Sequence, residues 1–244
     1  MEAAGRIVEQ LIGRAKRAKV QVESRGGMQP LLSIESQLSA GRIRELIEAA
    51  TQRVMSGAMP SLEGQMALEL GEGPPLYGTR MLGLQAQSAI GVEIGGEQAA
   101  AQGDPSRGFV LRSNPARLPF AGNSFAYVMG RLASAHQGDM VRVVQEIGRV
   151  LAPGGQGVVV DYHPYGLYAR RGTNRLRPAE SNIRKIEDYY RICKLAGIRV
   201  VDLKEALVEE EMRQLFKEEE IGVYRSLKGS PLLVFIFVYK PKQK

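Results

Sequence analysis

Residues 66–73 read MALELGEG, a short apolar run that ends in two glycines separated by one residue. A run of this length followed by turn-forming glycines predicts a buried strand over 66–70. Glycines at a strand end let a ligand approach the backbone where a side chain would block it. Two glycines alone are weak evidence, so the sequence that follows decides how they are interpreted.

The next strand candidate, residues 89–94, follows about twenty residues later and places Glu93 near its end. Doubly wound folds use an acidic residue at this place to accept hydrogen bonds from ribose hydroxyls. Helices are predicted over 139–151 and 183–196, and further strands over 109–112, 125–129, 158–162, 198–203 and 232–239. This alternation predicts an α/β fold with a mostly parallel, doubly wound sheet that binds ligands at the carboxyl ends of its strands.

The N-terminal residues follow a different pattern. Apolar residues at helical spacing predict one helix around 7–15 and a second over about 43–54, with Ser39 as its N-cap and Gly57 beyond its end. Residues 25–30 (RGGMQP) separate the two as a turn. We therefore expect residues 1–60 to form a helical extension or lid, and residues 61–244 to form the main domain.

Composition excludes several classes of protein. The longest apolar run, residues 231–239, is too short to cross a bilayer, and the N-terminus has no apolar leader, so we expect no membrane span and a cytoplasmic location. A single cysteine, Cys193, excludes an internal disulfide, and neither histidine has a second ligand at metal-binding spacing, so no metal is expected. We interpret the Cys193 thiol as buried packing.

The charge balance is basic, with 33 Lys and Arg against 26 Asp and Glu, a formal net charge of +7. This excess favours anionic partners. The basic stretches near 6–19 and 170–185 lack the interleaved aromatic residues of single-strand nucleic-acid binders. Nucleic acid is therefore not favoured as a partner, and solvated surface is the preferred interpretation.

Two later segments make the pattern specific. Residues 116–125 read ARLPFAGNSF and residues 146–155 read EIGRVLAPGG. With ELGEG and GVEI before them, in this order, the chain resembles the class I S-adenosylmethionine (SAM) dependent methyltransferases over about residues 65–240, particularly the small-molecule branch related to ubiquinone and menaquinone methylation. The resemblance implies a Rossmann-like, seven-stranded sheet with an antiparallel last strand, and SAM as cofactor. A nicotinamide dehydrogenase is disfavoured because the loop lacks G-x-G-x-x-G spacing.

The resemblance also implies site residues. Gly71 and Gly73 would approach the amino-acid and ribose parts of SAM, Glu93 would bind the ribose hydroxyls, and Asn114 would face the adenine amino group. The full set of implied cofactor residues is Glu69, Gly71, Gly73, Glu93, Ile94, Asn114, Pro115 and Gly130. Tyr165 and Arg170 are candidates for substrate contact.

Methyl transfer is an in-line displacement that depends mainly on holding donor and acceptor at attack distance, so no catalytic residue is obligatory. His136 and His163, the only two histidines, are predicted to follow the fourth and fifth strands. Either could act as a general base where the acceptor must lose a proton, and a structural role is the alternative for each.

Three positions depart from the family pattern. Pro75 replaces the third glycine of the first motif, Asn114 stands where aspartate is usual, and Ala126 follows SF in place of aspartate. We carry three hypotheses: a methyltransferase acting on a small molecule, a catalytically degenerate methyltransferase-like subunit that binds a partner or a second copy through its N-terminal helices, and an RNA or protein methyltransferase. The sequence does not identify the acceptor.

Overall fold

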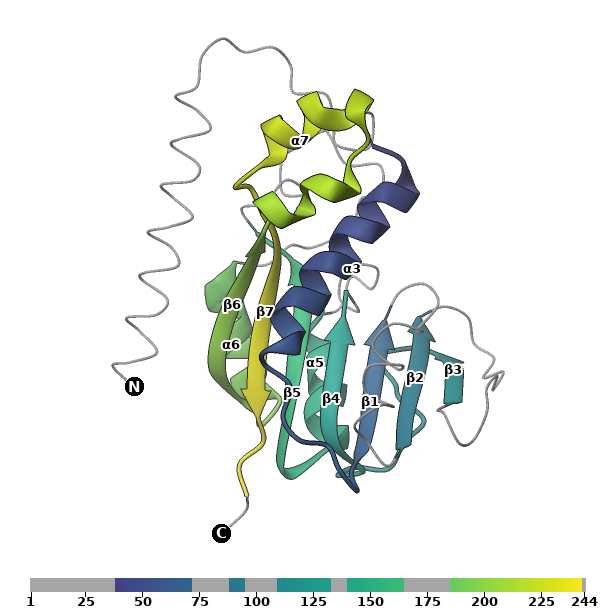
Figure 1. Ribbon diagram of the computed structural model, residues 1–244. Helices are drawn as coiled ribbons and strands as arrows, with labels where there is room; N and C mark the ends of the chain where they lie inside the picture. The colour runs from purple at the N-terminus through teal and green to yellow at the C-terminus, as the bar shows by residue number, and fades with distance from the viewer. Residues whose placement is uncertain (1–37, 72–87, 95–108, 133–139, 165–184, 243–244) are drawn as a thin grey trace. The chain divides into compact units, whose positions relative to one another are not determined.

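The computed structural model describes residues 38–71, 88–94, 109–132, 140–164 and 185–242 (Figure 1). In chain order the elements are α3 (Ala40–Ser56), β1 (Met66–Gly71), β2 (Ser88–Ile94), β3 (Phe109–Ser113), β4 (Phe125–Arg131), α5 (Met140–Val150), β5 (Leu151–Tyr162), α6 (Ile186–Leu195), β6 (Arg199–Leu207), the 3-10 helices η2 (Glu210–Leu215) and η3 (Glu218–Glu220), α7 (Ile221–Leu227) and β7 (Pro231–Tyr239).

These strands form one seven-stranded sheet in the order β3-β2-β1-β4-β5-β7-β6. Strands β3, β2, β1, β4 and β5 run parallel to one another. Strand β7 is antiparallel to β5, because the His163 amide bonds Leu232 O near one end and the Lys240 amide bonds Gly155 O near the other. The doubly wound, mostly parallel, seven-stranded sheet with an antiparallel last strand is therefore confirmed.

Most predicted elements lie within two residues of the observed ones, and Ser39 does cap α3 by accepting from the Arg42 amide at 3.2 Å. Two strand predictions were too short. Strand β5 begins at Leu151 rather than 158, because the Gly154 amide pairs with Lys240 O and extends the ladder through the P-G-G segment. Strand β6 continues to Leu207 rather than ending at 203. The helix predicted around 7–15 lies outside the described residues.

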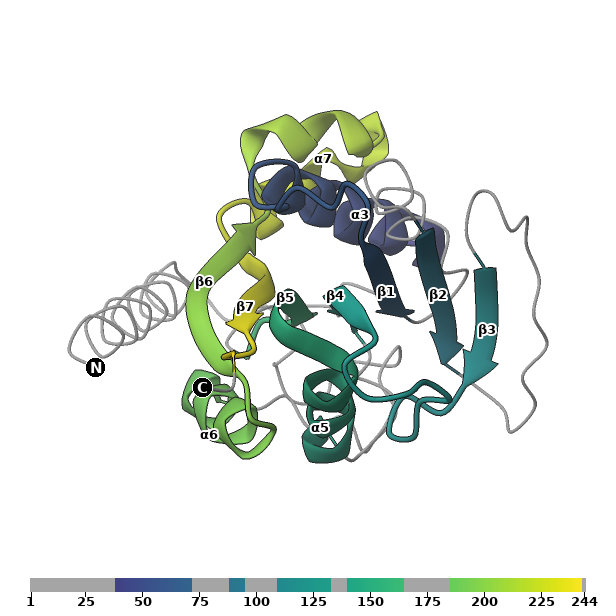
Figure 2. The ribbon, with the colours of Figure 1, turned by 90° about the horizontal axis from the view of Figure 1, so that it is seen from below.

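Close contacts divide the described residues into two compact units. The first unit comprises residues 59–71, 88–94, 109–132, 140–161, 185–203 and 235–242. In it, α5 and α6 lie side by side on one face of the sheet (Figure 2). A Cβ on Gly148 of α5 would stand 2.3 Å from the Ala196 carbonyl oxygen, so glycine is required for this close helix packing.

The second unit comprises residues 38–58, 162–164 and 204–234. Here α3 packs against η2, and its basic side chains meet the acidic segment that follows β6. Arg53 pairs with Glu209, and the Nε atom of Arg42 lies 3.3 Å from Glu220. The acidic residues near 209 and 220 therefore act as partners of α3. The division of the chain into 1–60 and 61–244, and the lid role of the first part, stay predictions.

The buried layer of α6 includes Cys193. Burial raises the pKa of the Cys193 thiol to about 12, so it is protonated at neutral pH and serves as packing.

Among the helices of the described residues, none combines the length and the apolar character needed to span a membrane.

Candidate functional site

The strand register brings the predicted cofactor residues to one edge of the sheet. Gly71, the last residue of β1, is in register with Glu93 of β2 on one side and with Arg131 of β4 on the other. Ile94, which ends β2, is in register with Ser113, and Asn114 follows directly. These positions all lie at the carboxyl ends of parallel strands, where open α/β sheets bind their ligands.

A buried ion pair lies beside Gly71. The Nε atom of Arg131 is 3.3 Å from Oε1 of Glu69, and the two side chains are 8% and 0% exposed. A Cβ on Gly71 would stand 3.3 Å from Nη2 of Arg131 and 3.6 Å from Oε1 of Glu69. Glycine therefore lets the Arg131 guanidinium pack directly against the backbone at this strand end, where a side chain would crowd it.

Gly130 has a different reason to be glycine. A Cβ there would stand 3.0 Å from the Cδ1 atom of Ile147, so its absence lets α5 pack closely against β4. The contact of Gly130 with a cofactor stays a prediction. Two residues later Leu132 adopts a φ of 53°, which is uncommon for a residue other than glycine, asparagine or aspartate. The chain thus turns sharply directly after Arg131.

Asn114 keeps the local role that an aspartate would have. Its Oδ1 accepts a hydrogen bond from the Ala116 amide at 2.8 Å, and its carbonyl accepts from the Arg117 amide at 2.9 Å. This side-chain turn is one that asparagine and aspartate share. The preceding strand end and the buried Pro115 fix the start of the segment. The departure at Asn114 is therefore structurally conservative.

The departure at Ala126 lies far from this edge. Ala126 is the second residue of β4, whose carboxyl end is Arg131, so it belongs to the opposite, amino-terminal edge of the sheet. A surface depression of the first unit lies at that edge, lined by residues that include Gln65, Ala126, Pro153 and Lys242. It holds none of the predicted cofactor residues, and we do not assign the site to it.

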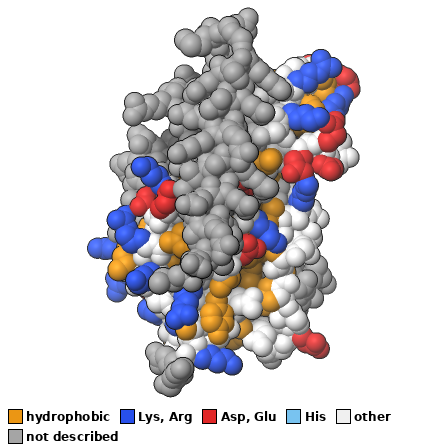
Figure 3. Space-filling view, turned by 90° about the vertical axis from the view of Figure 1, so that its left-hand side faces the viewer, with side chains coloured by type: hydrophobic (Ala, Val, Ile, Leu, Met, Phe, Trp, Pro, Cys, Tyr) orange, Lys and Arg blue, Asp and Glu red, His pale blue; other side chains and the backbone are white. Residues whose placement is uncertain are grey.

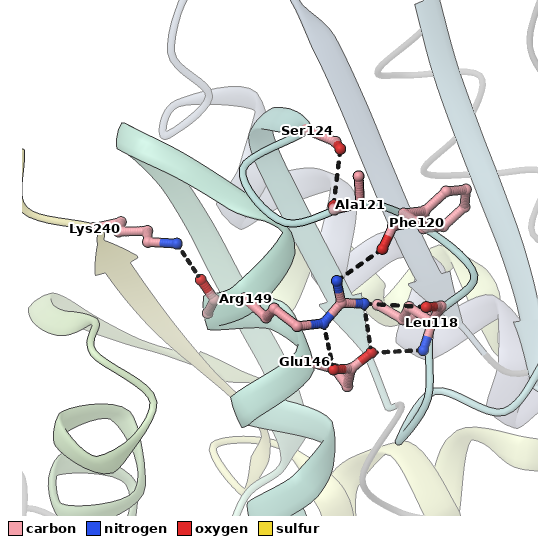
Figure 4. Close-up of polar contacts among 8 residues, drawn as sticks. Leu118, Phe120, Ala121, Ser124, Glu146, Arg149 and Lys240 are labelled. Carbon is pink, nitrogen blue, oxygen red and sulfur yellow. Dashed lines mark hydrogen bonds and ion pairs between the residues drawn. The ribbon is translucent and has the colours of Figure 1, made fainter.

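The two most specific motifs bind each other (Figure 4). Arg149 donates to both oxygens of Glu146, at 2.6 and 2.8 Å, and to the carbonyls of Phe120 at 2.7 Å and Leu118 at 3.0 Å. Glu146 in turn accepts from the Leu118 amide at 2.6 Å. The hydrogen bond from Arg149 is the main cause that holds the pKa of Glu146 below its usual value, and the bond from the Leu118 amide lowers the pKa further. Helix α5 thereby fixes the segment that begins at Asn114.

The turn before β4 and the chain after β7 cap the carboxyl end of α5. Asn123, at a φ of 62°, donates its amide to the Arg149 carbonyl, and the Ser124 amide donates to Val150. The ammonium of Lys240 donates to Gly148 O at 2.7 Å, Leu151 O at 2.7 Å and Asn123 Oδ1 at 2.8 Å. A cation at a helix C-terminus satisfies its unpaired carbonyls and favours the helix dipole.

His163 belongs to the second unit and is buried, and its Nε2 lies 2.8 Å from Oε1 of Glu205 on β6. This contact accounts for the histidine as a structural residue, and its action as a base stays a prediction. The neighbouring Asp161 is engaged in the first unit, where it accepts from the Tyr189 hydroxyl at 2.7 Å. Gly73, Pro75, His136, Tyr165 and Arg170 lie outside the described residues.

Sequence reasoning did not single out Arg131, which the structure places in register with Gly71 at the carboxyl edge of the sheet. The signal was present, because an arginine ends a strand that is otherwise almost wholly apolar. A buried arginine needs a partner, and a strand-end arginine in a parallel sheet lies at the ligand-binding edge.

Comparison with known proteins agrees with this geometry. Residues 68–159 match the methyltransferase domain family, and no match was found among curated proteins. The fold is shared with a SAM-dependent methyltransferase from Mesorhizobium loti, which is 16% identical with a TM-score of 0.59 and covers 80% of this chain and 100% of its own.

Two further structures share the fold. A putative methyltransferase of Haloferax volcanii, solved with the Trm112 methyltransferase activator, is 17% identical with a TM-score of 0.60, and the match covers 87% of this chain and 99% of the other. Phosphoethanolamine N-methyltransferase 2 of Haemonchus contortus, solved with SAM, is 17% identical with a TM-score of 0.55, and the match covers 81% of this chain and 53% of the other. The fold is that of class I methyltransferases.

Proposed function

We propose that this chain transfers a methyl group from SAM to a small-molecule acceptor. The observation that carries the proposal is the register that aligns Gly71 with Glu93, and Ile94 with Ser113 directly before Asn114, at the carboxyl edge of the sheet. Glu93 would accept hydrogen bonds from the ribose, and Asn114 would accept one from the adenine amino group. When bound, SAM supplies a methyl group activated by its sulfonium.

The residues of the chain then act mainly by positioning. A donor held in a fixed position lowers the entropic barrier to an in-line displacement. The contacts of Arg149 and Glu146 with the segment that follows Asn114 would help to fix that position. Where the acceptor must lose a proton, His136 or His163 would take it. Tyr165 and Arg170 would contact the acceptor, and a cationic Arg170 favours an acceptor that carries an anionic group.

A small acceptor is favoured over RNA by the distribution of charge. On the face drawn in Figure 3, Lys and Arg side chains of the described residues are interspersed with those of Asp and Glu. In the second unit, Arg42 and Arg53 of α3 are engaged by glutamates. The Haemonchus neighbour is named for a small phosphorylated amine, which supports an acceptor of this size.

A degenerate subunit that binds a partner remains the second hypothesis. Its basis in the sequence was Pro75, Asn114 and Ala126. Asn114 preserves its turn, and Ala126 lies at the edge away from the site, so two of the three departures do not argue against cofactor binding. The Haloferax neighbour was solved with an activator protein, so binding of a partner is compatible with activity.

Calorimetric titration with SAM tests the proposal. We expect saturable binding to the wild-type protein, at least tenfold weaker binding to Glu93→Ala, and unchanged binding to Glu187→Ala, a matched control on the exposed face of α6. Absence of binding to the wild type, or equal binding to Glu93→Ala, would contradict the proposal. Release of S-adenosylhomocysteine on addition of a small-metabolite fraction would then separate the enzyme from the degenerate subunit.

A further inference from the structure

We propose that Arg131, held in place by Glu69, binds the carboxylate of the amino-acid part of the cofactor and makes the site selective for ligands that carry this group. The inference rests on the proposed function, because it assumes that SAM binds at the carboxyl edge of the sheet. It concerns a residue that neither the motifs nor the matches assign to the site.

The structure holds Arg131 firmly at that edge. Arg131 is the last residue of β4, is in register with Gly71 and, at 7% exposed, is buried. Its Nε contacts Glu69 at 3.3 Å, and Leu132 directly after it has a left-handed backbone conformation. A left-handed conformation is unfavourable for leucine, and such conformations concentrate at functional sites, where the surrounding structure maintains them.

The strand order gives the ligand a direction. Along the edge β3-β2-β1-β4 stand Asn114, Glu93, Gly71 and Arg131 in turn. If Glu93 holds the sugar, the two remaining parts of the cofactor lie on either side of it. The adenine then lies toward Asn114 and the amino-acid part toward Gly71, where Nη2 of Arg131 stands 3.3 Å from the position that a Cβ would take.

The chemistry at the end of this path fits a carboxylate. The carboxylate is the only anionic group of SAM, and a guanidinium has five N–H donors in a planar fork that suits bidentate binding of carboxylates. Glu69 and Arg131 are together neutral, and the amino-acid part is a zwitterion that is also neutral. Binding therefore buries two complementary charge pairs and no net charge, which limits the desolvation cost.

A pair of nucleosides tests the inference by affinity alone. S-adenosylhomocysteine and 5′-methylthioadenosine share adenosine and sulfur, and only the first carries the amino-acid group. We expect the wild-type protein to prefer S-adenosylhomocysteine by at least about 30-fold in Kd. In Arg131→Gln this preference should fall about tenfold or more, while the Kd for 5′-methylthioadenosine stays within about twofold, since tenfold is the loss of about 1.4 kcal/mol from one contact.

Removal of Arg131 alone leaves Glu69 buried without this partner, so the variant could fail to fold. The double variant Glu69→Gln/Arg131→Gln removes both charges and should show the same loss of preference, and Arg191→Gln on α6 serves as the surface control. An unchanged preference in either folded variant, or a wild type that does not distinguish the two nucleosides, would overturn the inference while leaving the proposed function intact. A wild type that binds neither nucleoside would overturn both.

Discussion

Substitution of Arg149 by methionine tests how the two motifs hold the fold together. The change removes two hydrogen bonds to carbonyls and a bidentate ion pair with Glu146. The two bonds to carbonyls contribute about 1 kcal/mol each, and the ion pair adds about 0.5–1 kcal/mol because Arg149 is 39% exposed and partly screened by solvent. We expect a loss of about 2–3 kcal/mol in the free energy of unfolding.

Arg191→Met is the matched control. Arg191 also lies three residues after an acidic partner, Asp188, on a helix that flanks the sheet, but it is 71% exposed and bonds no distant carbonyl of the described residues. Its loss should cost no more than about 0.5 kcal/mol. Urea unfolding followed by far-ultraviolet circular dichroism measures both, and hydrogen exchange of the Leu118 amide reports the local effect. Equal costs for the two variants would refute the reasoning.

Three further predictions concern the same unit. The pKa of Glu146 is lower in the folded protein than its ordinary 4.5, so its contribution to stability is present above about pH 4.5 and is lost as pH falls through the folded-state value. The urea midpoints of wild type and Glu146→Gln should therefore converge in acid. A difference between the two midpoints that stays constant with pH would contradict this. Gly157→Ala would place a Cβ 2.6 Å from Val128 O and should lower the free energy of unfolding in urea by about 2 kcal/mol or more. In Gly57→Ala the new Cβ would have no described atom within 4 Å, so this variant should be nearly neutral. Equal costs for the two variants would be the contrary result. Lys240→Met leaves the α5 carbonyls without their cation and should lower the unfolding free energy by about 2 kcal/mol, and an effect no larger than that of the exposed Lys194→Met would count against this role.

The order of elements could be predicted because each apolar run is bounded by glycine, proline or a capping residue. Ser39 and Gly57 bounded α3 correctly. The P-G-G segment misled, because its residues usually form a turn, and the early start of β5 follows from the pairing of Leu151 with Phe125 and of Gly154 and Gly155 with Lys240. A ladder partner about 85 residues away leaves no local signal.

The same limit applies to the site. The positions of Glu93 and Asn114 at the carboxyl edge could be predicted because Glu93 is the penultimate residue of β2 and Asn114 directly follows β3. The contact of Arg131 with Glu69 joins residues 62 positions apart, and that of His163 with Glu205 joins residues 42 apart, and no motif contains either pair. The first contact depends on the pairing of β1 with β4, and the second joins β6 to the residue that follows β5, so both depend on how strands distant in sequence come together.

A crystal structure with S-adenosylhomocysteine tests the central claim most directly. Both ribose hydroxyls should lie within about 3.2 Å of the Glu93 carboxylate, with the nucleoside against the backbone of Gly71. A nucleoside bound at any other edge of the sheet, or a Glu93 carboxylate that makes no contact with the sugar, would contradict the claim.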